Sequence, residues 1–331
     1  MFESLKRFTR PATIASAVLL GATAVMAADV PQASVVLTEM GLSADAVQRV
    51  LAGEFVSTEV PPVSERDLSI AIGFLVKTTP AEFAKQIIAG ELVSADPNIK
   101  ARGKLTSAST TADLAKLPVA DSTAQALAGA EAGSDVNLST AEIAAFNGAG
   151  AAGAADQLRA MLLQRYQSYS ASGLAGIPAY DRGGSSSDPA ADLRAASASS
   201  RGLKKYLPAL QQTLLNYPNA AMTGLDEEFF WIAYDIDGKP TYALTHIMAA
   251  PDGDARVIVQ RQFYVSTGYN AEQAVAGFLP VEGGTVVVYT NHTFTDQVAG
   301  FGGSMKRGIG RNMMEGQLKK VFDKMRSMAA Q

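Results

Sequence analysis

The stretch DLSIAIGFLVKTTPAEFAKQIIAGEL, residues 67–92, decides the fold because it contains a strand signal followed at once by a helix signal. From Leu68 to Val76, large apolar residues alternate with mostly smaller ones, which is typical of a strand with one face in a core. Thr79 can then cap a helix whose first residue is Pro80, where a missing N–H costs nothing. The stretch therefore predicts a strand–helix unit.

The C-terminal part of the chain predicts an antiparallel sheet closed by a long helix. Three apolar runs, EEFFWIAYDI, PTYALTHIMAA and ARVIVQRQFYVS, fall within residues 227–266. Asp-Gly turns at 237–238 and 252–253 separate them, and glycine tolerates the positive φ that tight hairpins need. TVVVYTNHTF, residues 285–294, predicts a fourth strand, and we expect a helix from there to about Met328.

Glycines and basic residues are frequent between Thr295 and Gly316, so this stretch has to be tested against phosphate-binding loops. Neither GFGGSM at 300–305 nor GIGRNM at 308–313 has the third glycine of a dinucleotide-binding loop. Lys306 also lacks the preceding glycine and the following Ser or Thr of a P-loop. We therefore interpret the stretch as the start of the final helix.

The final helix is expected to have one apolar face and to contain three costly glycines, Gly308, Gly310 and Gly316. Each glycine costs about 1 kcal/mol relative to alanine inside a helix. Close approach of the helix to a sheet would offset that cost, and a mobile wall facing a ligand is the second interpretation. The expected apolar face comprises Met305, Ile309, Met313 or Met314, Leu318, Val321, Phe322, Met325 and Met328.

Residues 1–27 have the parts of a secretory signal peptide. A basic start is followed by an uncharged apolar segment, and Val25 and Ala27 are the small residues that a signal peptidase reads. We predict cleavage after Ala27 and a periplasmic location, with a retained N-terminal anchor helix as the alternative. No other stretch is long and apolar enough to span a bilayer.

Composition excludes several classes of function. The chain of 331 residues has 28 basic and 32 acidic residues, and signal cleavage would leave 25 and 31, a net charge of −6. Such an acidic chain is not expected to bind nucleic acid. No cysteine occurs, which excludes disulfides and thiolate chemistry, and His246 and His292 are too few for a three-histidine zinc site. We predict no metal and no cofactor.

Few residues suggest catalysis. His246 lies in the middle of a predicted strand, and His292 lies near a strand end, where it could pair with Asp296. Glu227 and Glu228 resemble an acid–base pair, but adjacent strand residues point to opposite faces. No serine-hydrolase elbow is present.

The chain divides by composition into a helical entry segment at 28–62 and a domain at 63–331. Within that domain, residues 101–226 are predicted to be a helix-rich insertion. Its helix starts include a capping box at Ser139 and an N-cap at Asp188 that precedes a proline.

LVKTTPAEFAKQI at 75–87 and VVVYTNHTF at 286–294, with the helix that follows, resemble the first and last parts of START-like proteins. This helix-grip superfamily includes polyketide cyclase and lipid-transfer branches, and the resemblance covers Leu68–Lys100 and Glu227–Met328. The C-terminal block is also similar to secreted proteobacterial proteins of unknown function. The resemblance implies an α+β fold in which a curved antiparallel sheet grips the long C-terminal helix around an apolar cavity. It implies these cavity residues: Tyr242, Leu244, His246, Met248, Phe263, Tyr289, Met305, Ile309 and Met313.

We therefore predict a binding or carrier protein for a hydrophobic small molecule or lipid, rather than an enzyme. An envelope protein that docks a partner through its helical region is one alternative, and an exposed apolar patch on residues 157–218 would favour it. A histidine-dependent hydrolase or cyclase is another. An imidazole within hydrogen-bond reach of a carboxylate in a cleft would favour the enzyme.

Overall fold

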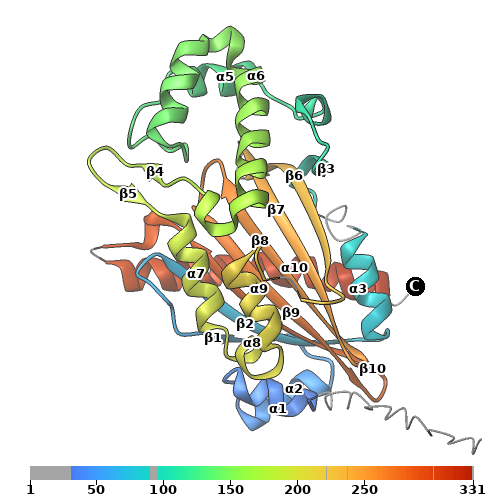
Figure 1. Cartoon of the computed structure of the whole chain (residues 1–331). Coiled ribbons are helices and arrows are strands. Elements are labelled where there is room, and N and C mark those ends of the chain that lie inside the picture. Colours follow the sequence, from blue (N-terminus) through green and yellow to red (C-terminus); the bar gives the residue numbers. More distant parts are fainter. Residues whose placement is uncertain (1–30, 90–95, 221, 237, 301, 330–331) are drawn as a thin grey trace, which may run out of the picture.

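The computed structural model describes residues 31–329 apart from 90–95, 221, 237 and 301, so the predicted signal peptide lies outside the described residues. The centre of the molecule is an antiparallel sheet of eight strands in the order β1-β2-β10-β9-β8-β7-β6-β3 (Figure 1). The strands are β1 (Val56–Glu59), β2 (Asp67–Val76), β3 (Ile99–Leu105), β6 (Asp226–Ile236), β7 (Lys239–Asp252), β8 (Ala255–Val265), β9 (Ala271–Val281) and β10 (Gly284–Phe294).

Helices cover both faces of this sheet. They are α1 (Ala33–Glu39), α2 (Ala44–Leu51), α3 (Pro80–Ile88), α5 (Asp121–Ala128), α6 (Thr140–Ser172), α7 (Pro189–Ser199), α8 (Arg201–Tyr206), α9 (Pro208–Asn216) and α10 (Gly303–Ala329). Short elements complete the chain: the 3₁₀ turns η1 (Thr111–Leu114), η2 (Gly173–Gly176) and η3 (Asp296–Val298), and the small hairpin β4 (Tyr180–Asp181) and β5 (Ser186–Ser187).

Four helices begin at the capping residues that the sequence predicted. Ser43, Thr79, Ser139 and Asp188 precede α2, α3, α6 and α7, and each side chain accepts a hydrogen bond from the backbone N–H three residues later. These bonds satisfy donors that the first turn of a helix leaves free. The local chemistry therefore fixes where these helices start, independently of the tertiary packing.

The first predicted strand lies beside the last one. β2 pairs with β10 along its whole length, from Val76 opposite Thr285 to Asp67 opposite Phe294. The helices that follow these two strands, α3 and α10, share one hydrophobic cluster and therefore one face of the sheet. We call this side the grip face. The predicted class, an α+β fold in which an antiparallel sheet holds a long C-terminal helix, is confirmed.

Aromatic rings fill the core of the grip face. The ring of Phe322 in α10 lies 4.5 Å from that of Phe74 in β2 and 5.4 Å from that of Tyr289 in β10, measured between centroids. Phe83 in α3 meets Phe278 in β9 edge-on at 5.5 Å. Such pairs stabilise by about 0.5–1.5 kcal/mol beyond the burial of their area. They fix α3 and α10 on the sheet.

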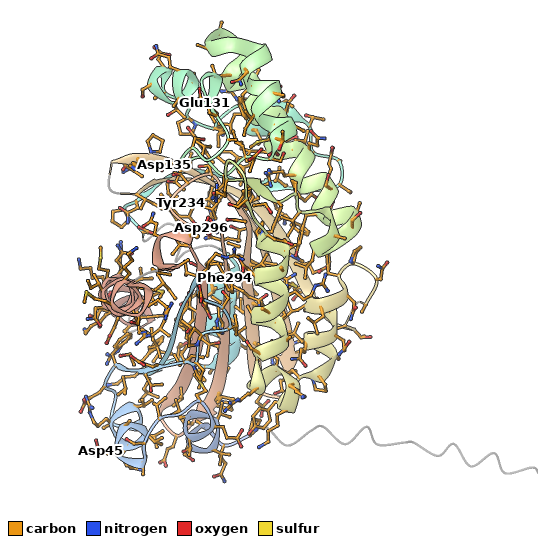
Figure 2. All side chains as sticks on the ribbon, turned by 90° about the vertical axis from the view of Figure 1, so that its left-hand side faces the viewer. Asp45, Glu131, Asp135, Tyr234, Phe294 and Asp296 are labelled. Atoms are coloured by element: carbon orange, nitrogen blue, oxygen red, sulfur yellow. The ribbon has the colours of Figure 1, made fainter. Side chains whose placement is uncertain are left out.

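The opposite side, which we call the helical face, is covered by α1, α2 and α6 to α9. Figure 2 shows α10 on one side of the sheet and the insertion helices α6 to α9 on the other. α5 and the first half of α6 project beyond the sheet (Figure 1). Both faces of the central strands are therefore buried, and ten consecutive residues of β7, from Thr241 to Ala250, have no exposed face.

Several elements differ from the sequence expectation. The predicted insertion at 101–226 is helix-rich, but most of β3 lies in it and pairs with β6 at the sheet edge. The small-residue segment at 148–155 lies within α6, whose helical geometry breaks at Gly150 with φ 62°. β1 and β9 were not predicted, since β9 is rich in alanine and contains a glycine and a proline.

One of the three costly glycines of α10 is explained by close approach to the sheet. A Cβ on Gly310 would lie 3.1 Å from Leu68 Cδ1, whereas Gly308 and Gly316 face open space. The close-approach interpretation is therefore correct for Gly310 and wrong for the other two. The stripe Gly310, Met314, Leu318 and Phe322, at spacing four, faces the sheet.

The predicted apolar face of α10 was too wide. Met305, Ile309 and Met313 are 74%, 58% and 60% exposed and form a second stripe at spacing four, turned away from the sheet. The side chains of Met325 and Met328 lie outside the described residues. A helix that lies on a sheet buries a narrower stripe than one enclosed by neighbours, so apolar spacing alone overestimated its contact face.

Candidate ligand-binding site

The nine residues predicted to line one cavity do not surround a common space. Five of them are buried on the helical face, beneath the insertion helices: Tyr242, Leu244, His246, Met248 and Phe263. Tyr289 is the one member of the nine that lies on the grip face against α10, at Phe322. The remaining three are the exposed residues of α10. The set was chosen across both faces of the sheet because one sequence does not tell which side of a strand looks inward.

A cavity of about 340 Å³ lies on the helical face, between the sheet and α1, α7, α8 and the connection at 60–63. We call it the helical-face pocket. Its volume falls in the range of small-molecule sites, roughly 300–1,000 Å³. Its walls are mostly apolar and include Val36, Met40, Val60, Val257, Leu279 and Val288. None of the nine predicted residues lines it.

His292 lies in the wall of this pocket, held by a buried carboxylate. Its Nδ1 is 2.9 Å from Oδ2 of Asp67, which also accepts the backbone N–H of Val63 at 2.8 Å. Asp67 is 1% exposed. An ionised carboxylate only accepts hydrogen bonds, so the imidazole proton lies on Nδ1. Nε2 is then a free acceptor, and it makes no hydrogen bond to any described residue.

The sequence suggested a carboxylate partner for His292, but it indicated Asp296 instead of Asp67. Asp296, four residues further along, bonds Arg182 at 2.9 Å and Ser187 at 2.7 Å instead. Burial opposes the effect, but the bonds from Ser187 and Arg182 lower the pKa of Asp296 below its usual value. The true partner, Asp67, is far away in sequence and close only because β2 pairs with β10.

Gln273 is a further polar residue of the pocket wall, and its orientation is fixed by buried groups. Its Oε1 accepts from Arg261 Nε at 3.1 Å, from Arg261 Nη2 at 2.9 Å and from Ser197 Oγ at 3.0 Å. An arginine side chain never accepts a hydrogen bond, so the atom that faces it must be the amide oxygen. The amide NH₂ points elsewhere and has no partner among the described residues. Gln273 lines the pocket, although its residue is only 2% exposed.

These groups belong to one row that crosses the helical face. His292 is the cross-strand partner of Gln273, Gln273 of Arg261, and Arg261 of His246. Directly opposed residues in an antiparallel pair have Cβ atoms about 4.5–5.5 Å apart. The sheet therefore places the His292 acceptor, whose imidazole is bonded to Asp67, next to the Gln273 donor, whose amide oxygen is bonded to Arg261.

α1 and α8 both line the pocket and are joined by polar contacts. Glu39 of α1 accepts hydrogen bonds from Lys205 and from the hydroxyl of Tyr206 in α8, the latter at 2.8 Å. The hydrogen bond from Lys205 is the main reason that the pKa of Glu39 is lowered. The pair is exposed, so we expect it to contribute little to stability and to open readily.

His246 has acidic and phenolic neighbours but no cleft. Its Nδ1 lies 3.1 Å from the hydroxyl of Tyr169, and its Nε2 lies 3.2 Å from Oε1 of Glu227 without a well-aligned hydrogen bond. The residue is fully buried. Burial lowers its pKa, and the neighbouring Glu227 only partly opposes this. Glu228 bonds Lys104 on the other face, as the strand alternation predicted.

The remaining alternatives were tested against the same structure. The large exposed apolar side chains of the described residues are Val35, Met305, Ile309 and Met313, so none lies in the helical region 157–218. A second hollow, of about 590 Å³, lies between η2 and α7, and it is shallower and lined largely by alanines. It lacks polar groups fixed in orientation by buried charges.

Within the described part of the chain, no three His, Asp or Glu side chains are grouped closely enough to hold a metal ion. Over the same residues, no helix has both the length and the hydrophobicity needed to cross a bilayer.

Comparisons with known proteins give a weak similarity to a solved structure. No family model matches the chain, and no curated protein matches it. Among solved structures, it is similar to the crystal structure of Ara h 8.0201, with 12% sequence identity and a TM-score of 0.23. The alignment covers 43% of this chain and 89% of that chain.

Proposed function

We propose that this protein binds a hydrophobic small molecule or lipid in the helical-face pocket. The observation that carries the proposal is an apolar cavity of about 340 Å³ with two polar groups of fixed orientation in its wall. Apolar walls supply affinity, at roughly 25 cal/mol per Å² of buried surface. A few fixed polar groups orient the ligand, which is the usual composition of a small-molecule site.

We further propose that the protein carries this ligand in the periplasm. The support is the signal-peptide pattern of residues 1–27 together with the acidic mature composition. Cell fractionation tests the location: the mature chain, shortened by the predicted 27 residues, should be released with the periplasmic fraction. Full-length protein in the membrane fraction would contradict it.

The binding proposal is tested by filling the pocket. Gly277 lines it, and a Cβ there would meet only the Val288 carbonyl oxygen, at 3.9 Å. Gly277→Leu should therefore fold normally and occupy the cavity. Native mass spectrometry of gently purified mature protein, followed by organic extraction, should show a bound lipid near one per chain in the wild type and little in the variant.

Gly316→Leu is the matched control, because Gly316 lies in α10 on the other side of the sheet and faces open space. It should retain the bound molecule. A wild-type protein that carries no small molecule, and takes up none from an added lipid extract, would contradict the proposal. Equal loss in both glycine variants would show that the pocket is not responsible.

The Asp67–His292 pair favours a hydrolase as the second candidate. With Nδ1 bonded to the carboxylate at 2.9 Å, Nε2 is set to remove a proton from a water molecule that attacks an ester. A hydrolase should cleave 4-nitrophenyl esters of straight-chain acids above the buffer rate. Asp67→Asn should then lose most of the turnover, because an amide no longer fixes the imidazole tautomer. Wild-type turnover at the buffer rate would exclude this candidate for that ester class.

A further inference from the structure

Two polar residues on the sheet side of the helical-face pocket, His292 and Gln273, form a matched pair. The His292 Nε2 is an acceptor because the buried carboxylate of Asp67 holds the proton on Nδ1. The Gln273 NH₂ is a donor because Arg261 and Ser197 hold its oxygen. The two residues are direct cross-strand partners, and both line the pocket. One planar head group with a donor and an acceptor can reach both.

A positive charge, Arg261, lies against the Gln273 side of this pair, and among the described residues it has no bonded counter-ion. Arg261 is fully buried, and its partners among the described residues are all neutral: the Gln273 amide oxygen, the Tyr169 and Ser197 hydroxyls and the Leu214 carbonyl. A buried charge without an ionic partner is costly, so a nearby anion would be favoured. The Gln273 amide oxygen faces the Arg261 guanidinium and its N–H groups face away from it, so the amide dipole directs its positive end toward the pocket.

We propose that the ligand is an apolar carboxylic acid whose head group bridges His292 and Gln273, an inference that rests on the proposed function. The acid shares one proton with the His292 Nε2, and its other oxygen accepts from the Gln273 NH₂. The hydrocarbon part lies along Val257, Leu279 and Val288. A simple alcohol satisfies only one of the two groups. A primary amide satisfies both but has no acidic proton to give the imidazole and gains nothing from Arg261.

Calorimetric titration of the delipidated mature protein with decanoate, decan-1-ol and decanamide at pH 7 tests this assignment. The three share a chain length and differ in the head group. Hydrogen bonds that involve a charged group are stronger than neutral ones, so decanoate should bind roughly 10- to 100-fold more tightly than either neutral ligand.

The decisive variant is Gln273→Glu. The carboxylate keeps a partner for Arg261, so the buried cation stays satisfied and the fold is retained. The substitution removes the donor and adds a charge that repels the ligand acid. Decanoate affinity should fall roughly 10-fold or more, while decan-1-ol affinity should change by less than about threefold. Gln260→Glu, the same change on the grip face of β8, is the matched control and should leave both affinities unchanged.

The outcomes separate this inference from the function on which it rests. If none of the three ligands binds and no lipid co-purifies, the proposed function fails and this assignment fails with it. If all three bind with similar affinity, the binding function stands and the carboxylic-acid assignment is overturned. Decanamide binding as tight as decanoate binding, or a Gln273→Glu protein that keeps its decanoate affinity, would also overturn it.

Discussion

His246 shows how a single buried residue couples this fold to pH. Its imidazole stacks on Phe229 with ring centroids 4.1 Å apart and bonds Tyr169, with Glu227 and Arg261 as the charged neighbours. Burial lowers its pKa below the ordinary 6.5, with Arg261 adding to the effect and Glu227 opposing it. The folded protein therefore holds a neutral imidazole, which the unfolded chain would protonate in mild acid.

This environment predicts a stability loss in mild acid. Below pH 6.5 the unfolded state binds a proton that the native state does not, so stability falls as the pH falls. One such proton contributes a slope of up to about 1.4 kcal/mol per pH unit. Urea unfolding at pH 7.5, 6.5 and 5.5 should show a shallower slope for His246→Gln than for the wild type. The same slope in both proteins would contradict the buried neutral histidine.

Single residues were predictable wherever the decisive contact was local. The caps Ser43, Thr79, Ser139 and Asp188 were predicted because each bonds a backbone group three residues away. Gln273 was not, since nothing in the alanine-rich β9 segment indicates that an arginine on the next strand fixes its amide.

At the scale of one element, α10 contains one glycine that fits tightly against the sheet and two glycines whose cost in helix stability no contact offsets. Gly310 touches Leu68, whereas Gly308 and Gly316 meet no neighbouring atom within 4 Å. Two hydrogen bonds add to the contacts of the helix. The Ser57 hydroxyl donates to Glu315 at 2.5 Å, and Arg326 donates to the Gly53 carbonyl at 2.8 Å. The helix is thus held along its length.

Alanine substitutions should separate these positions. Gly308→Ala and Gly316→Ala should each stabilise the protein by about 0.5–1 kcal/mol, because alanine removes backbone freedom from the unfolded chain. Gly310→Ala should gain less or lose stability, since its Cβ would press on Leu68 at 3.1 Å. Thermal unfolding of the three variants measures their order of stability. An equal gain at all three sites would show that Leu68 yields freely.

β9 illustrates why an element was missed. Its sequence AEQAVAGFLPV contains few β-branched or aromatic residues, so its own propensity for a strand is weak. It forms because β8 and β10 supply hydrogen-bonding partners along both edges. Tertiary pairing thereby overrides a weak local preference.

At the scale of the whole molecule, Arg261 ties the sheet to the insertion helices. From β8 it reaches Tyr169 in α6, Ser197 in α7 and the Leu214 carbonyl in α9, each at 2.9–3.1 Å. One side chain therefore joins three helices to the sheet. The insertion depends on this bond network as well as on apolar packing.

Arg261→Met should cost about 2–5 kcal/mol of unfolding free energy, because the buried Leu214 carbonyl loses the arginine donor and the Gln273 oxygen keeps only the bond from Ser197. Removal of the buried charge by itself would raise the unfolding free energy, but the loss of hydrogen bonds to the buried acceptors outweighs this gain. Arg256→Met is the control, as Arg256 bonds only nearby backbone carbonyls, and its change should stay within about 0.5 kcal/mol. Chemical denaturation compares the two. A neutral Arg261→Met would contradict this role.

The sequence by itself determined the parts of this protein that depend on neighbours along the chain. These are the strand and helix of residues 67–88, the hairpins between β6, β7 and β8, the closing strand and the final helix, and hence the α+β class. Hydrophobic periodicity, caps and glycine turns act over a few residues, so one chain is enough to recognise them.

Only the tertiary structure decided which face of each strand meets which helix. Helices bury both sides of the sheet, so side-chain alternation loses the contrast that would assign an inner and an outer face. The pairing of His292 with Asp67 joins strands that lie far apart in the sequence, and the fixed amide of Gln273 needs Ser197 of α7 as well as Arg261 of the neighbouring strand. Contacts over such separations leave no periodic signal, which is why the site had to be found in three dimensions.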